Sequence, residues 1–351
     1  MRGFLCRTCG QRLSFEDGRC PQCRSALGFW LPTRTIEVLD ARGRVDVGGR
    51  TLRRCANSIV AQCNWLVDEQ WGWAALCASC QLTRVRPGDH DRVGLAAFGQ
   101  VEATKRRILV ELDQLGLPLR GRTVDPVSGL AFDLLSRTGG PVTTGHLDGV
   151  ITLDLSEVDA THRERVRVAL AEPYRTVIGH FRHELGHYYQ MVLVDRRGRT
   201  PDPAPAQRFR ELFGDPDVDY SAALYRHYAV GPPLGWQSRH VSAYATMHPV
   251  EDFAETFAHY LHLRDTVDTA AAHAMSPPAL ATAAAAPAGF ERLIQWWLPL
   301  TWALNQFNRS GGRPALYPFI LADEVLDKMR FVHDLVVGAG RSGESPAHPV
   351  Q

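Results

Sequence analysis

The amino-acid sequence predicts an α+β fold, in which a mainly helical domain with a small β-sheet follows a short cysteine-rich module. Three observations indicate this. Apolar residues recur with helical spacing over most of residues 96–337. In one segment of that region, residues 149–155, the side-chain character alternates along the chain and β-branched residues are frequent, as is typical of a β-strand. All eight cysteines precede residue 81, so the composition changes there.

The overall composition is that of an ordinary globular protein. Of the 351 residues, 45% are hydrophobic and 22% are charged, and a formal net charge of +1 gives no general attraction to nucleic acid or anionic membranes. The first residues, MRGFLCRTCG, lack the apolar core of a signal peptide, and no run of about 18 uncharged apolar residues occurs. We therefore expect a cytoplasmic protein with no membrane partner.

The first cysteines form two C-x-x-C pairs in residues 4–27. The pairs are Cys6/Cys9 and Cys20/Cys23, and ten residues separate them. Two such knuckles can supply four thiolates to one tetrahedral zinc ion, as in a zinc ribbon, and a segment this short needs the metal in order to fold. A redox-active C-x-x-C would require a βαβ context, which this segment lacks. We predict a zinc ribbon over residues 1–30 with a structural zinc.

The other four cysteines predict a second zinc-binding module over residues 31–90. They are less regularly spaced, at Cys55, Cys63, Cys77 and Cys80. The alternative is four buried thiols that pack as small hydrophobic groups. Trp65, Trp71 and Trp73 are expected to cover this module. Nucleic-acid stacking on them is a weaker interpretation, because no basic stripe alternates with the tryptophans.

Further elements follow from periodicity and turn residues. A helix is predicted over 96–117, and its basic cluster Lys105–Arg107 is expected to be a solvated face. Residues 125–145 and the proline-rich 199–206 are predicted loops. The other helices are predicted over 160–170, 174–194, 249–263, 290–308 and 322–337, with 220–244 partly helical and broken at 231–233. Trp297 and Trp302 are expected in the core, and 341–351 is expected to be a disordered tail.

The central motif is His183-Glu184-Leu185-Gly186-His187, within the helix predicted to start near Pro173. Residues four apart project from one face of a helix, so His183 and His187 can bind one metal ion. Glu184 lies about 100° further round, where its carboxylate can reach a metal-bound water. This H-E-x-x-H pattern is typical of a zinc site with a general base, although a chance match on an interior helix gives the same letters.

A third ligand is available on the helix that begins at Pro249. Phe253, Phe257 and Leu261 have the spacing of a core face, and Glu251 and Glu255 lie one turn apart on another. Glu251 would complete a site of two histidines and one glutamate, and Glu255 could accept the free N–H of a ligand histidine. The alternative is a solvated face that carries both glutamates.

The segments HFRHELGHYY and HPVEDFAETFAHYLHLRD resemble a bacterial family of zinc-binding metallopeptidases with an amino-terminal zinc ribbon, and the resemblance runs from Cys6 to about Val337. It implies a zincin-like catalytic domain over residues 91–340. Both segments are similar to gluzincin motifs, which implies Glu251 as ligand and Glu255 as its partner. Lethal-factor-type peptidases have a tyrosine two turns upstream of the ligand, a place that Tyr244 occupies. By the same resemblance, the strand at 149–155 is the edge strand that pairs with substrate.

The predicted function is therefore that of a zinc metallopeptidase acting on a peptide or protein substrate. Its Zn²⁺ complement is one catalytic and two structural ions. Tyr244 is expected to donate to the oxyanion, with His240 and His248 as competitors. One alternative is a regulator that binds protein or nucleic acid through its zinc ribbon and uses the peptidase fold as an inactive scaffold. The other is a zinc hydrolase of non-peptide amides.

Overall fold

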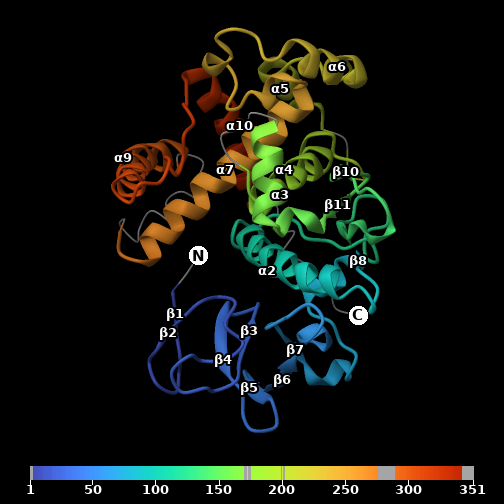
Figure 1. The fold of residues 1–351 in the computed structure, drawn as a ribbon, viewed down its shortest axis with the longest axis vertical. Helices are drawn as coiled ribbons and strands as arrows, with labels where there is room; N and C mark the ends of the chain where they lie inside the picture. Colours follow the sequence, from blue (N-terminus) through green and yellow to red (C-terminus); the bar gives the residue numbers. More distant parts are fainter. Residues whose placement is uncertain are drawn as a thin grey trace.

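The computed structural model describes residues 3–169, 172, 175–198, 200, 202–275 and 289–341. It has the α+β fold that the sequence predicts, with the cysteine-rich region at one end and the helical region at the other (Figure 1). Helix α2 (Arg92–Gln114) lies between the two. Within the described ranges, no helix is long and apolar enough to cross a membrane.

The cysteine-rich region consists of short antiparallel strands around a small aromatic core. The strands are β1 (Phe4–Leu5), β2 (Arg12–Leu13), β3 (Leu27–Trp30), β4 (Thr35–Val38), β5 (Arg44–Val47), β6 (Arg50–Arg54) and β7 (Leu66–Asp68), paired as β1-β2, β3-β4 and β5-β6-β7. Phe29 packs against Phe15 and Trp65, both buried. Trp73 does not cover this core as expected: it is 80% exposed, with the Arg53 guanidinium over its ring.

One four-stranded sheet borders the helical region, in the order β10-β11-β9-β8. Its strands are β8 (Thr83–Val85), β9 (Ala131–Leu135), β10 (Gly145–Leu147) and β11 (Val150–Asp154). The predicted loop over 125–145 was wrong at β9, whose largely buried residues pair in parallel with β11. The predicted strand exists as β11, but it is not the edge. A tight turn at Asp148 and Gly149, both with positive φ, joins β10 to β11. The two strands pair antiparallel, and β10 is the outer strand.

The basic cluster on α2 is not a solvated face. Lys105 and Arg106 are buried because both form ion pairs with Glu102, which is itself buried; the Lys105 Nζ–Glu102 Oε1 distance is 2.6 Å. Arg106 also donates to the backbone carbonyls of Ala61 and Gln62, at 3.2 and 3.1 Å. The charges therefore join α2 to the loop that carries the second group of cysteines.

The remaining helices surround a common core. They are α1 (Ala78–Gln81), α3 (Ala160–Ala169), α4 (Val177–Tyr189), α5 (Pro203–Phe213), α6 (Tyr220–Val230), α7 (Pro249–Ala272), α9 (Gly289–Ser310) and α10 (Asp323–Arg341). The predicted core face of α7 is confirmed, since Phe253, Phe257 and Leu261 are fully buried. Trp297 is buried too, but Trp302, expected in the core, is 66% exposed on α9.

Several helix boundaries differ from the prediction, among them the ends of α2, α7 and α10, and at the start of α4 and of α5 a side chain caps the backbone. Helix α4 begins at Val177, where the Thr176 hydroxyl accepts from the amide of Gly179, and a π-helical turn continues it over Gln190–Val194. Helix α5 starts inside the predicted proline-rich loop, because Asp202 accepts from the amide of Ala204. Pro173, residues 276–288 and the tail 342–351 lie outside the described residues.

Candidate metal centre

Helices α4 and α7 cross in direct contact, and this crossing builds the centre (Figure 1). Gly186 stands where the two backbones come closest. A Cβ atom at that position would lie 2.7 Å from Ala254 Cα and 2.9 Å from its carbonyl oxygen. The glycine within the H-E-x-x-H motif therefore allows α7 to bring its carboxylates to the histidines of α4.

The structure brings His183, His187 and Glu251 together at one point. The two Nε2 atoms are 3.2 Å apart, and Glu251 Oε2 lies 3.0 Å from His183 Nε2 and 3.4 Å from His187 Nε2. Tetrahedral zinc with bonds of 2.0–2.1 Å would separate its ligand atoms by about 3.3 Å, so the three atoms fit such an ion. Glu251 Oε2 is buried and has no hydrogen-bond donor among the described residues, which also fits a metal ligand.

Glu255 lies one turn further along α7 and holds the first histidine. His183 Nδ1 donates to Glu255 Oε1 at 2.7 Å, which places the proton on Nδ1 and leaves the Nε2 lone pair free for a metal. Burial opposes ionisation of Glu255, but its bond to His183 outweighs this and lowers the pKa of the carboxyl to about 2. This is the geometry expected of a carboxylate that fixes a ligand histidine.

Glu184 lines the cavity beside the centre. Its carboxylate is largely buried, and Oε2 has no hydrogen-bond partner in the described structure. Burial raises the pKa of Glu184 above its ordinary value, although the neighbouring His183 and His187 lower it. A carboxylate with a raised pKa and a free oxygen is suited to accept a proton.

Two aromatic residues near the candidate metal ligands were not predicted from the sequence. Tyr220, the first residue of α6, donates its hydroxyl to Glu251 Oε1 at 3.0 Å. His146, on the edge strand β10, stacks on His187 with ring centroids 6.3 Å apart. Tyr244, which was predicted, lines the cavity with its ring 5.9 Å from that of His183. Burial raises the pKa of the Tyr244 hydroxyl far above its usual range, so it stays a donor.

The other two candidates for oxyanion donor have structural contacts. His248 is the N-cap of α7: its Nδ1 accepts from the amide of Val250 at 3.2 Å, and its Nε2 donates to the carbonyl of Val218 at 3.0 Å. Both ring nitrogens are thereby used. His240 lies 3.6 Å from the carboxylate of Asp252, outside the residues that line the cavity. The geometry favours Tyr244 over both.

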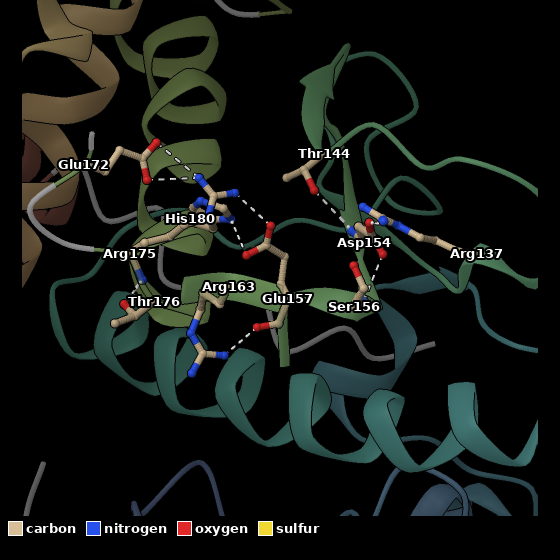
Figure 2. A network of polar contacts seen from close by, with 11 residues as sticks. Arg137, Thr144, Asp154, Ser156, Glu157, Arg163, Glu172, Arg175, Thr176 and His180 are labelled. Carbon is tan, nitrogen blue, oxygen red and sulfur yellow. Dashed lines mark hydrogen bonds and ion pairs between the residues drawn. The ribbon is translucent and has the colours of Figure 1, made fainter. Parts of the chain in front are cut away.

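A cavity of about 500 Å³ extends from the centre along the first turns of α4. Its wall contains a polar network (Figure 2) in which Arg175 lies between Glu157 and Glu172, at 2.8 and 3.0 Å. His180 Nδ1 lies 3.6 Å from Glu157 Oε2, and burial lowers the pKa of His180 to about 4. Glu157 belongs to the turn after β11, so the network links the start of α4 to the sheet.

The eight cysteines form the two predicted groups of four. In the first, Cys6 and Cys23 are 3.7 Å apart between their Sγ atoms, as are Cys9 and Cys20. In the second, all four residues, Cys55, Cys63, Cys77 and Cys80, are buried, with 3.6 Å between the Sγ atoms of Cys63 and Cys77. Zinc–sulfur bonds of 2.3 Å in a tetrahedron place the sulfurs about 3.8 Å apart, so both groups fit a zinc ion.

Comparison with known proteins identifies two matching regions. Residues 3–91 match a zinc-ribbon domain, and residues 94–335 match a family described as "Putative zinc-binding metallo-peptidase". Uncharacterized proteins of Mycobacterium bovis and Mycobacterium tuberculosis are 52% identical over 352 residues, covering 99% of this chain and 98% of each relative. No solved structure matches the chain.

Proposed function

The chain belongs to the zinc-binding metallo-peptidase family, with a zinc ribbon before the peptidase region, and on that basis we propose that it hydrolyses peptide bonds in a zinc-dependent reaction. The family resemblance of the sequence is thereby confirmed. The main support for this activity is that one possible ligand atom from each of His183, His187 and Glu251 lies within 4.8 Å of the other two. Beside them lies Glu184, which can act as a base. The two four-cysteine groups would hold structural zinc ions.

Each residue of the centre has a distinct role in this proposal. A zinc ion, when bound by His183, His187 and Glu251, would lower the pKa of a water and polarise the substrate carbonyl. Glu184 takes the proton from that water with its free oxygen and passes it to the leaving amine. Tyr244 donates a hydrogen bond to the oxygen that becomes negative in the transition state.

The edge strand β10 gives the substrate a place to bind. It is the outer strand next to the centre, and His146 on it stacks on His187. An extended peptide could add to this outer edge of the described sheet through main-chain hydrogen bonds, which would lay a peptide bond beside the candidate ligands. The proposal thus moves the substrate-binding edge from residues 149–155 to 145–147.

The test is a peptide-library digest with purified protein, with and without a chelator, followed by Glu184→Gln. The amide keeps the shape of Glu184 but cannot accept the proton, so cleavage should fall by about 10²–10⁴-fold. Glu211→Gln, an exposed site on α5, should leave cleavage unchanged. Zinc content of both variants should equal that of the parent.

Three outcomes would separate the alternatives. Undiminished peptide cleavage by zinc-loaded Glu184→Gln would contradict the mechanism. Failure of the parent to cleave any peptide, with a full zinc complement, would favour a binding protein that recognises its partner through the zinc ribbon. Chelator-sensitive cleavage of simple amides but not of peptides would identify a non-peptide amide hydrolase.

A further inference from the structure

The two oxygens of Glu251 face different neighbours. Oε2 faces the two histidine nitrogens, at 3.0 and 3.4 Å, whereas Oε1 accepts the hydroxyl of Tyr220 at 3.0 Å. Glu251 lies on α7 and Tyr220 on α6, so the contact joins two elements that are 31 residues apart in sequence. Neither the H-E-x-x-H pattern nor the glutamate pair on α7 indicates this tyrosine.

The hydroxyl restricts how the carboxylate can turn. Glu251 is only 3% exposed in the presence of Tyr220, so Oε1 is shielded from water as long as the tyrosine ring stays in place. A buried carboxylate oxygen without a hydrogen-bond donor is unfavourable, and the side chain can avoid this by rotating toward another donor. Such a rotation would turn Oε2 away from His183 and His187.

The position of Tyr220 is itself fixed from two sides. His248, the N-cap of α7, donates to the carbonyl of Val218 and holds the chain two residues before Tyr220. The ring of His248 lies 5.2 Å from that of Tyr220. On the other side, Asp219 caps α6 by accepting from the amide of Ala222 at 3.0 Å. The capping histidine that sequence reasoning considered for the oxyanion thus supports the tyrosine.

We propose that Tyr220 is a positioning residue of the metal centre: its hydroxyl holds Glu251 Oε1 so that Oε2 remains directed at His183 and His187. The inference rests on the zinc centre proposed above but not on its catalytic activity. It also makes α6 a part of the centre. Ala223 is the one buried residue of this helix, and the Tyr220 hydroxyl connects α6 to Glu251 of α7.

The test measures zinc affinity by chelator competition in Tyr220→Phe, beside the matched control Tyr225→Phe. Tyr225 lies on the same helix but is 78% exposed. Loss of a hydrogen bond to a ligand weakens metal binding by about 10–100-fold. We expect a loss of this size for the most weakly held zinc in Tyr220→Phe, and no loss in Tyr225→Phe. Zinc held by the cysteine groups serves as an internal reference and should not change.

A second variant distinguishes positioning from general loosening of α6. Asp219→Ala removes the cap of the helix but leaves the Tyr220 hydroxyl in place, so zinc affinity should fall by less than in Tyr220→Phe. Equal losses in the two variants, or unchanged affinity in Tyr220→Phe, would overturn the proposal. Because the readout is affinity, an inactive parent protein would refute the peptidase function and leave this inference standing.

Discussion

Substitution of Gly186 by alanine should weaken both the fold and the metal centre, although alanine is the better helix former. In an open helical position the same change stabilises a protein by about 1 kcal/mol. At Gly186 the new Cβ would lie 2.7 Å from Ala254 Cα, whereas carbon atoms prefer separations of about 3.5–4.0 Å. The contact is with backbone, which cannot rotate away, so α4 and α7 must move apart by about 1 Å.

Both effects can be given a size. Overpacking of a core costs about 1–3 kcal/mol, and the cost of Gly186→Ala should be toward the upper end because the new contact is with backbone. After the gain in helix propensity is subtracted, the free energy of unfolding should fall by about 1–2 kcal/mol. Metal sites tolerate displacements of about 0.2 Å. Separating α4 from α7 by several times that distance would move Glu251 away from both histidines, so zinc affinity should fall by at least about tenfold.

The assay compares Gly186→Ala with Gly338→Ala, by thermal unfolding and by zinc competition. Gly338 lies on α10, and no atom comes within 4 Å of the Cβ that alanine would add there. The control should therefore unfold at a slightly higher temperature than the parent and bind zinc equally well. If Gly186→Ala behaves like Gly338→Ala in both measurements, the close approach of the two helices does not determine the centre and the reasoning is wrong.

Three further results are expected. Elemental analysis of carefully purified protein should find about three zinc ions per chain, and only two would count against the second cysteine site. Glu251→Ala should lose the zinc of the centre, whereas Glu255→Ala should weaken it by about 10–100-fold; the reverse order in chelator competition would exchange their roles. Lys105→Met should leave Glu102 with only its longer ion pair to Arg106 and destabilise the fold by about 1–3 kcal/mol in denaturant unfolding, against at most about 1 kcal/mol for the more exposed Arg107→Met.

The parts predicted well are those whose geometry one element determines. The placement of His183 and His187 on one face follows from helical spacing alone, and the buried face of α7 follows from the positions of Phe253 and Phe257. The position of Glu251 beside the two histidines could be inferred because a zinc site would need a third ligand and the helix that carries Glu251 begins with a clear signal at Pro249.

The parts missed depend on contacts between distant segments. Tyr220 has no local pattern that marks it, since its partner is on another helix. The edge strand β10 has three residues in a stretch rich in glycine and threonine, and only its pairing with β11 defines it. Lys105 and Arg106 resemble an exposed basic patch in sequence, because the acceptors that allow their burial include carbonyls more than 40 residues away.

The contacts between α2 and the cysteine-rich region limit how the chain could be shortened. Strand β8 follows directly after Cys80 and covers one side of β9. A fragment that starts at residue 94, where the match to the peptidase family begins, would lose β8 and the carbonyls that Arg106 binds. It would expose β9 as an unpaired apolar edge, the kind of surface on which chains aggregate. The region that matches the zinc ribbon thus supplies the outer strand of this sheet, so the two regions should be produced as one polypeptide.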